Sequence, residues 1–177
     1  LMVKTGAGKI ADLIATTPGA DIICIQMRFF GDSGLAVLGN GLVTEALTKA
    51  SHESFEKNRN VKSLARNGGP FIKITSNHMP GFDPDAGQFP RIFNAGGQEL
   101  RREAYDGARF RMIPETFSSM RFAQLNHYCT RTLSDFRAKK YRGTAANNDK
   151  KLHMNFFVER NRNEVQDNEI QPHVPAI

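Results

Sequence analysis

A histidine and three cations follow one another closely in the last third of the chain. His127 ends the strand expected at 124–127, and Lys139, Lys140 and Arg142 come just before Gly143. A neutral imidazole is a common metal ligand, and cations on a helix that ends at a glycine suit phosphate oxygens. These residue types therefore predict a site for a charged, phosphorylated ligand.

Short strands and helices are expected to position these residues. The run Ile22 to Met27 is nearly continuously apolar and of strand length, which is typical of a strand covered on both faces of an α/β sheet. Further strands are predicted at 61–64, 71–75, 109–113 and 124–127, helices at 9–15, 133–141 and 150–160, and a long loop region at 81–97. Because the sequence contains no internal repeat, we expect a single domain over residues 1–177.

Composition limits the class of protein. The 177 residues are 40% hydrophobic and 24% charged, as in a globular domain that buries about two-thirds of its unfolded surface. No apolar run approaches the roughly 20 residues that span a bilayer, so no transmembrane segment is expected. The two cysteines, Cys24 and Cys129, form no CxxC pair and no disulfide framework, which favours a reducing, cytoplasmic location.

The positive charge of the chain favours anionic partners. A net charge of +6 and a pI near 9.5 are compatible with nucleic acid, acidic lipid or nucleotide phosphates. The lysines and arginines form no long uninterrupted block, and no nucleic-acid-binding motif is present. We therefore expect no nucleic-acid partner, and a basic nucleic-acid-binding domain remains the lesser alternative.

The glycine-rich start of the chain is similar to a phosphate-binding loop only in part. Gly6-Ala7-Gly8-Lys9 ends like a P-loop, but Val3 replaces its first glycine and Ile10 replaces the magnesium-binding serine or threonine. We interpret this segment as a loop that starts a helix.

Six short motifs follow a helix and an apolar strand in a fixed order along the chain. They are Arg28-Phe29-Phe30-Gly31-Asp32-Ser33-Gly34, Gly41-Leu42-Val43-Thr44-Glu45, Val61-Lys62-Ser63-Leu64-Ala65-Arg66, Asn126-His127-Tyr128-Cys129-Thr130-Arg131-Thr132, the helix from Phe136 to Gly143, and Asn163-Glu164-Val165-Gln166-Asp167. In this order they resemble the C-terminal portion of bacterial glycosyltransferases of the family 2-like type, which have the GT-A fold. The resemblance covers residues from about 6 to 170.

The chain also departs from that family's pattern. An Asp-x-Asp motif should lie just upstream of Leu1, and Asn67 stands where relatives tend to have proline. The resemblance therefore implies an α/β, GT-A-like mixed sheet flanked by helices and incomplete at its N-terminal side.

The implied activity is transfer of a sugar, with inversion, from a UDP- or GDP-type nucleotide-sugar donor to a saccharide or related acceptor. In this interpretation His127 completes an Mn²⁺ or Mg²⁺ site begun by the upstream aspartates, while Lys139, Lys140 and Arg142 face the diphosphate. Metal and cations would stabilise the negative charge that builds on the departing diphosphate.

The remaining candidates lie elsewhere along the chain. Inverting transfer needs a carboxylate that takes the proton of the acceptor hydroxyl, and Asp32 and Glu45 are the candidates. Lys62 and Ser63 are placed like a strand end that contacts donor or acceptor.

Each candidate has a structural alternative. His127 would be a strand-end histidine bonded to backbone, the three cations a solvated helix face, Asp32 a turn residue that satisfies backbone donors, Glu45 a residue of a first helical turn, and Lys62 an edge-strand lysine. The corresponding alternative function is a non-catalytic nucleotide- or glycan-binding protein that keeps only part of the site.

Overall fold

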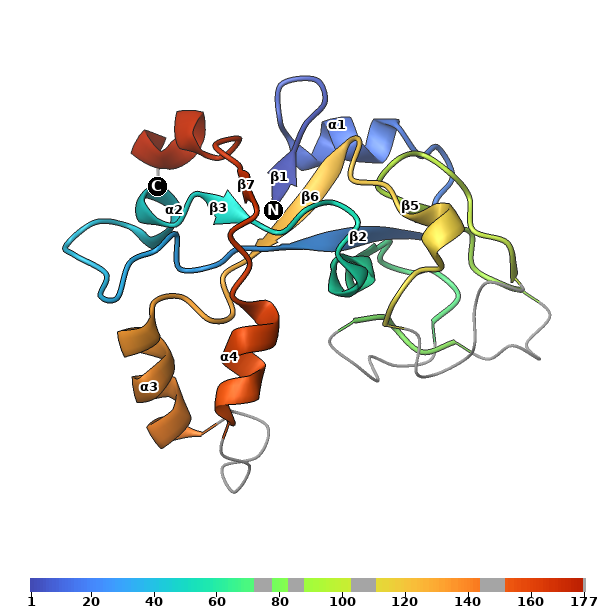
Figure 1. The fold of residues 1–177 in the computed structure, drawn as a ribbon. Helices are drawn as coiled ribbons and strands as arrows, with labels where there is room; N and C mark the ends of the chain where they lie inside the picture. The colour runs from blue at the N-terminus through green and yellow to red at the C-terminus, as the bar shows by residue number, and fades with distance from the viewer. Residues whose placement is uncertain (72–77, 83–87, 103–110, 144–151, 177) are drawn as a thin grey trace. The chain divides into compact units, whose positions relative to one another are not determined.

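The computed structural model describes residues 1–71, 78–82, 88–102, 111–143 and 152–176 (Figure 1). Over these residues the fold is mixed α/β, with a five-stranded mixed sheet, a two-stranded sheet and four α-helices. The expected α/β class is therefore confirmed. The chain divides into two compact units, which we call the first unit (Leu1–Met27 and Glu56–Leu125) and the second unit (Arg28–Phe55 and Asn126–Ile177).

The elements have the following bounds. The strands are β1 (Met2–Val3), β2 (Ile22–Phe29), β3 (Lys49–Ala50), β4 (Val61–Ala65), β5 (Ile92–Asn94), β6 (Ala123–His127) and β7 (Val165–Gln166). The helices are α1 (Ile10–Ala15), α2 (Val43–Ala46), α3 (Leu133–Arg142) and α4 (Met154–Arg160), with 3₁₀ turns η1 (Glu56–Arg59), η3 (Glu115–Phe117) and η4 (Gln171–Ala176).

Strand β2 is the centre of the larger sheet. The strand order is β1-β6-β2-β4, and β5 also pairs with β2. β4 runs antiparallel to β2, with Ile22 opposite Ala65, whereas β5 runs parallel to it, with Ile22 opposite Ile92. β1 pairs antiparallel with β6, where Met2 lies opposite Gln124.

All eight residues of β2 are buried because both faces of the strand are covered. Ile22 and Cys24 belong to one hydrophobic cluster, which also contains Val61, Met79, Phe82, Ile92, Leu100 and Ile113. Ile23 and Ile25 belong to the other, with Val3, Leu13, Ala95 and Ala123. This alternation is the two-residue period of a strand, and it confirms the expected strand with two covered faces.

Several predicted elements are confirmed with small shifts of their ends. The helices expected at 9–15 and 133–141 are α1 and α3, and the strands expected at 61–64 and 124–127 are β4 and β6. The helix expected at 150–160 begins only at Met154, since His153 has the extended backbone of an N-cap residue (φ −89°, ψ 156°).

Other predicted elements are wrong or lie outside the described residues. Of the strand expected at 109–113, only residues 111–113 are described; they form no strand, and Met112 makes an isolated bridge to Asn60. β5 interrupts the loop region expected at 81–97, because Ile92 and Phe93 are buried against β2. Of the strand expected at 71–75, only Phe71 is described, and it lies outside any strand.

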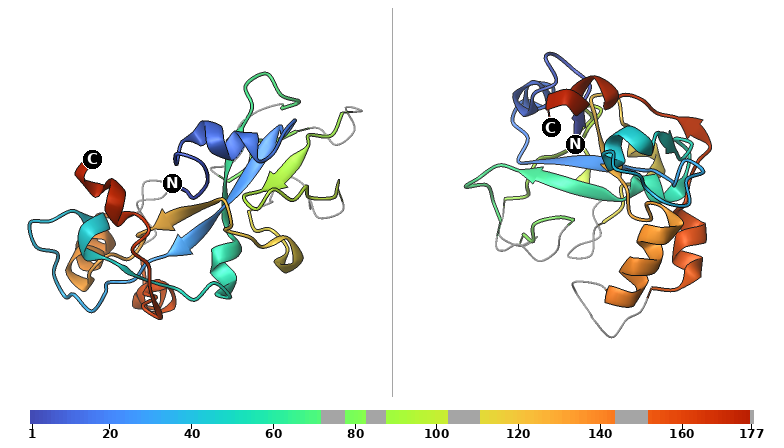
Figure 2. Two further views of the ribbon diagram at one scale, coloured as in Figure 1. Left: turned by 90° about the horizontal axis from the view of Figure 1, so that it is seen from above. Right: turned by 90° about the vertical axis from the view of Figure 1, so that its left-hand side faces the viewer.

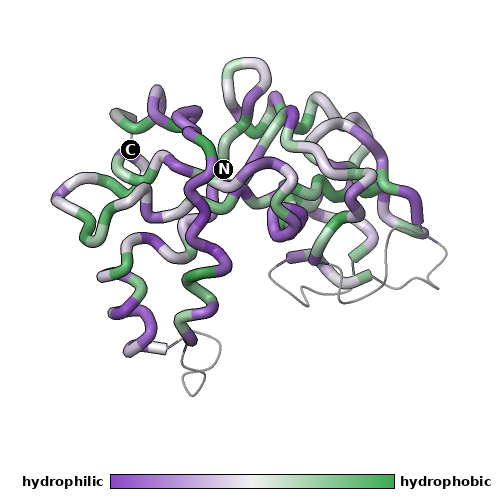
Figure 3. Tube along the Cα trace, viewed as in Figure 1, coloured by the Kyte–Doolittle hydropathy of each residue, from purple (hydrophilic) through white to green (hydrophobic). Residues whose placement is uncertain are grey.

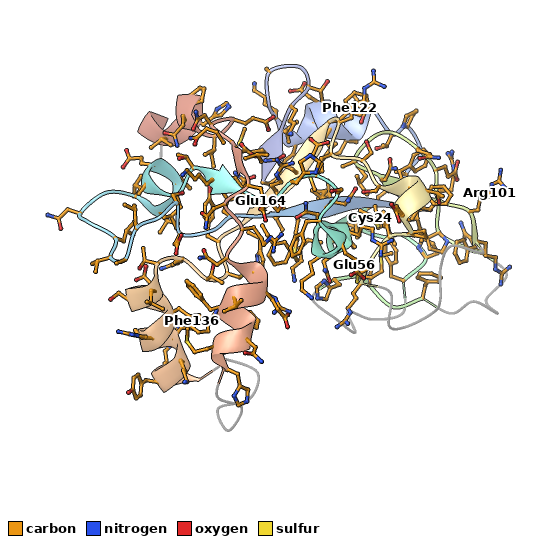
Figure 4. All side chains as sticks on the ribbon, in the orientation of Figure 1. Cys24, Glu56, Arg101, Phe122, Phe136 and Glu164 are labelled. Carbon is orange, nitrogen blue, oxygen red and sulfur yellow. The ribbon has the colours of Figure 1, made fainter. Side chains whose placement is uncertain are left out.

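In the second unit, α3 and α4 lie side by side (Figures 1 and 2). Phe136 of α3 is fully buried and points toward α4 (Figure 4). Its ring lies 5.2 Å from that of Phe157 and 6.1 Å from that of Phe156, centroid to centroid. Burying a phenylalanine of this kind contributes about 1.5–3 kcal/mol, so these three rings hold the helix pair together.

Among the described residues, no helix combines the length and the apolar character needed to cross a bilayer.

Gly31 and Gly39 provide a test of packing in the second unit. A Cβ atom on Gly31 would collide with the side chain of Asn163 and with the carbonyl of Arg162, whereas a Cβ on Gly39 would meet no atom within 4 Å. We therefore expect Gly31→Ala to lower the free energy of unfolding by about 1–3 kcal/mol. Urea denaturation followed by circular dichroism measures this, with Gly39→Ala as the matched control expected to stay within about 0.5 kcal/mol of the parent chain. Equal stabilities for the two variants would contradict the close packing at Gly31.

Candidate functional site

A basic cavity lies beside α3, wholly within the second unit. Its volume is about 210 Å³, and we call it the α3 pocket. It is lined by Tyr128, Cys129, Thr130, Arg131, Asp135, Lys139 and Arg142. Three of these side chains are cations and one is a carboxylate, so the pocket carries a positive balance suited to an anion.

The start of α3 is fixed by its N-cap. The Thr132 hydroxyl accepts a hydrogen bond from the Asp135 backbone N–H (3.2 Å) and donates one to the Asp135 carboxylate (2.9 Å). This satisfies a helix N–H that would otherwise have no partner and is worth about 1 kcal/mol. The Asp135 carboxylate, which lines the pocket, is therefore also hydrogen-bonded to the Thr132 hydroxyl of the cap.

Helix geometry brings two of the predicted cations together. Asp135, Lys139 and Arg142 are spaced i, i+4 and i+7, which places them on one face of α3, while Lys140 lies about 100° away from Lys139. Accordingly Lys139 and Arg142 line the pocket, and Lys140 is not among its lining residues. The expected end of the helix is confirmed, since Gly143 (φ 81°) donates its N–H to the Lys139 carbonyl (3.1 Å).

Lys139 is held in place by two contacts. Its ammonium donates a hydrogen bond to the Cys129 carbonyl (2.9 Å) and lies 5.7 Å from the centre of the Phe156 ring. The Arg160 guanidinium also makes a cation–π contact with the Phe156 ring, 4.1 Å from the ring centre. An ammonium has three donors, so Lys139 can keep its bond to Cys129 and still donate to a ligand in the pocket.

Arg131 is a pocket residue to which the sequence analysis assigned no role. Its φ of 53° is in the left-handed region, which is uncommon for a residue other than glycine. Such a conformation costs free energy and is over-represented at ligand-binding sites. Its position between the end of β6 and the cap of α3 brings a third cation to the pocket, and no spacing rule in the sequence signals this turn.

The wall formed by residues 128–130 is largely buried. Thr130 is 1% exposed, and its buried hydroxyl has no hydrogen-bond partner among the described residues. Burial is the main cause that raises the pKa of the Tyr128 hydroxyl. The Thr130 hydroxyl is thus a buried polar group at the pocket wall whose hydrogen-bonding capacity is not used within the described chain.

His127, the predicted metal ligand, lies at the end of β6, one residue before the pocket. It is half-buried, and its ring packs edge to face on Phe29 with 5.0 Å between centroids. Its carbonyl accepts the Phe30 N–H (3.2 Å). In the part of the chain that the structure describes, no three His, Cys, Asp or Glu side chains are grouped as metal ligands would be. The described residues alone therefore do not complete the predicted metal site.

Asp32, a predicted base, lies in a hydrogen-bonded turn. Oδ1 accepts from the Gly34 N–H (2.9 Å) and from the Asn163 amide (3.1 Å), and Oδ2 accepts from the Asn161 amide (2.9 Å). The same two asparagines also act as acceptors, since the Asn161 amide oxygen accepts the Asp32 N–H and the Asn163 amide oxygen accepts the Ser33 N–H. Three donors occupy most of the four or so acceptor sites of a carboxylate, as the turn interpretation expects, and a role of Asp32 as the base stays a prediction.

Glu45, the second predicted base, is a helix-capping residue. Its Oε2 accepts the Leu42 N–H (2.9 Å) at the start of the four-residue helix α2. This is the first-turn position that the structural alternative expected, where a carboxylate is favoured by the helix dipole. Neither Asp32 nor Glu45 lines the α3 pocket.

Lys62 and Ser63 belong to β4 in the first unit. The Ser63 hydroxyl donates to the His78 carbonyl and lies 3.3 Å from the Met79 sulfur. Partial burial lowers the pKa of the Lys62 ammonium. The Ser63 hydroxyl thus has a structural partner, and a contact of either residue with donor or acceptor stays a prediction.

The glycine-rich loop before α1 is confirmed as a helix-start loop. The Asp12 carboxylate accepts the N–H groups of Ala7 and Lys9, each at 2.9 Å. A carboxylate of the chain itself therefore occupies the N–H groups that a phosphate would need.

Comparisons with protein-family models, with curated proteins and with solved structures find no match for this chain.

The pocket cysteine and the β2 cysteine are expected to be unreactive thiols. Burial raises the pKa of Cys129 to about 11, against smaller opposing effects of Lys139 and Arg160, and raises that of Cys24 to about 12. Since the thiolate is the nucleophile, a thiol-disulfide reagent at pH 8 should react with the folded chain more than about a hundredfold slower than with the urea-unfolded chain.

Raising the pH toward 11 should accelerate the reaction of the folded chain, because a raised pKa moves thiolate formation upward in pH. The absorbance of the thiol that the reagent releases measures the reaction rates of the folded chain and of the unfolded chain. A fast-reacting thiol in the folded chain at pH 8 would show that at least one of Cys24 and Cys129 is not held as a protonated, buried thiol.

Proposed function

We propose that this chain is part of a nucleotide-sugar-dependent glycosyltransferase and that its α3 pocket binds the diphosphate of the donor. The observation that carries the proposal is the joint lining of one pocket by Arg131, Lys139 and Arg142. Two of these cations are those that the resemblance to family 2-like glycosyltransferases assigned to the diphosphate.

The size of the pocket supports a small anion as the occupant. A volume of about 210 Å³ corresponds to roughly seven water molecules at about 30 Å³ each. Pockets for whole drug-sized ligands span about 300–1,000 Å³. The pocket therefore has room for phosphate groups but not for a complete nucleotide sugar, whose base and sugar would lie outside it.

The chemistry of the lining suits a departing diphosphate. The Arg142 guanidinium offers forked donors that match phosphate oxygens, and the Lys139 ammonium adds a point charge. As the bond between sugar and diphosphate breaks, negative charge builds on the diphosphate, and fixed cations stabilise that charge more than the ground state. The Thr130 hydroxyl would find in a phosphate oxygen the acceptor that it lacks within the described chain.

A metal ion is not required for this part of the proposal. Because the described residues do not group three metal ligands, we assign no step to Mn²⁺ or Mg²⁺ and leave the role of His127 as a prediction. Binding of the diphosphate by the three cations is expected with a chelator present.

A second function, non-catalytic binding of nucleotides or glycans, is favoured by one observation. Both candidate bases are engaged in hydrogen bonds within the second unit, Asp32 with three donors and Glu45 with the Leu42 N–H. Under this alternative the α3 pocket binds a phosphorylated ligand without transfer of a sugar.

Isothermal titration of pyrophosphate into the chain in EDTA tests the pocket. We expect binding, and we expect Arg142→Gln to weaken it about fivefold or more because one charge-assisted contact is lost. Arg137→Gln is the matched control, since Arg137 is an exposed cation on the opposite face of the same helix. His127→Ala should leave metal-free binding unchanged. Equal losses for Arg137→Gln and Arg142→Gln would mean that general charge, not the pocket, binds the anion.

Asp32→Asn separates a structural from a binding role of this carboxylate. Replacing Oδ1 or Oδ2 by an NH₂ group removes an acceptor facing N–H donors, so the free energy of unfolding should fall by about 1–3 kcal/mol. Pyrophosphate affinity should not change, because Asp32 does not line the pocket. Urea denaturation and titration measure the two quantities, with the exposed Glu115→Gln as the surface control. Unchanged stability would argue against the turn role of Asp32.

A further inference from the structure

The loop between β2 and α2 exposes three large apolar side chains. Leu35, Val37 and Leu42 are 38%, 65% and 44% exposed, and no charged residue occurs between Asp32 and Glu45. In Figure 1 this segment is a projecting loop of the second unit, and in Figure 3 much of it has the colour of hydrophobic residues. Exposed apolar patches are a feature of interaction sites, so this loop is a candidate for one.

The loop is held at several points. At its start, the Leu35 N–H donates to the Asp32 carbonyl (2.9 Å), and at its end the Leu42 N–H donates to Glu45. Between them, the Ala36 carbonyl accepts the N–H of Ser134, in the first turn of α3 (3.1 Å). The apolar side chains are therefore presented from a braced loop that lies against α3.

The face of α3 that continues from this contact carries one cation and one aromatic ring. Ser134, Arg137, Ala138 and Tyr141 are exposed and spaced i, i+3, i+4 and i+7, so they share one helix face. Tyr141 is 89% exposed. Of the five basic side chains in residues 131–142, Arg131, Lys139 and Arg142 line the pocket, which leaves Arg137 and Lys140 outside its lining.

From this combination we propose that the second unit docks on an anionic membrane surface, with the loop 35–42 inserted among the lipid headgroups and Arg137 beside it. Apolar side chains that enter the interface and cations that attract anionic lipid are the two contributions that bind proteins peripherally to bilayers. Tyrosine is enriched at this depth because its ring is apolar and its hydroxyl is polar. The two cations of α3 outside the pocket lining, Arg137 and Lys140, favour an anionic lipid surface over an apolar protein groove as the occupant.

The docking face is distinct from the α3 pocket. Arg137 lies on the opposite side of α3 from Lys139 and Arg142, and no residue of the loop 35–42 lines the pocket. The proposal therefore goes beyond the proposed function and does not depend on it.

Co-sedimentation of the full chain with vesicles tests the proposal. Vesicles of phosphatidylcholine mixed with phosphatidylglycerol should bind the chain, and vesicles of phosphatidylcholine alone should bind it at least about tenfold more weakly. The variant L35S/V37S should lower binding to the mixed vesicles about tenfold, and Arg137→Gln about fivefold, since a cation near an anionic surface contributes about that factor.

Matched control variants distinguish docking through this face from nonspecific adsorption to vesicles. Val158→Ser removes an equally exposed valine (68%) from α4, and Arg101→Gln removes an exposed cation of the first unit, labelled in Figure 4. Both should bind mixed vesicles like the parent chain. Circular dichroism of each variant checks that the fold is retained.

Three results would overturn the proposal: no binding to the mixed vesicles, equal binding losses for Val158→Ser and L35S/V37S, or complete displacement from vesicles by pyrophosphate under conditions that saturate the α3 pocket. The last would assign vesicle binding to the pocket. We expect L35S/V37S and Arg137→Gln to bind pyrophosphate like the parent chain. Vesicle binding and pyrophosphate binding can therefore be tested independently of each other.

Discussion

The start of α3 at Thr132 is the constraint on which the candidate site depends. The Thr132 cap with Asp135 fixes where the first helical turn begins, and the helical repeat then decides which later side chains share a face. Lys139 and Arg142 meet at the pocket for this reason, and Arg137 faces the other way. The packing of Phe136 against Phe156 and Phe157 keeps the helix in place.

The parts of the structure that could be predicted from the sequence are those with a local signal. β2 was recognisable because its apolar run is nearly continuous, and the end of α3 because a glycine follows it. The same helical period could also have separated Lys140 from Lys139 and Arg142. β5 was missed because its three residues gain their strand conformation from pairing with β2, a contact that no local pattern encodes.

Asp32, one of the two candidate bases, also has partners that no local pattern encodes. Asp32 is bonded by Asn161 and Asn163, which lie about 130 residues further along the chain. A turn motif predicts that an aspartate satisfies nearby N–H groups, but it does not reveal distant amides. Arg131 is a similar case, because its left-handed backbone arises where β6 passes into the cap of α3. The resemblance to glycosyltransferases supplied roles for residues, while the physical partners of those residues came only from the fold.

The central claim is that the α3 pocket holds a diphosphate between Lys139 and Arg142. The most direct test is a crystal structure of the chain grown with pyrophosphate and a chelator. The account predicts density for the anion in the pocket, within hydrogen-bond distance of the Lys139 ammonium and the Arg142 guanidinium. Density for pyrophosphate at another site, with the α3 pocket holding only water, would contradict it.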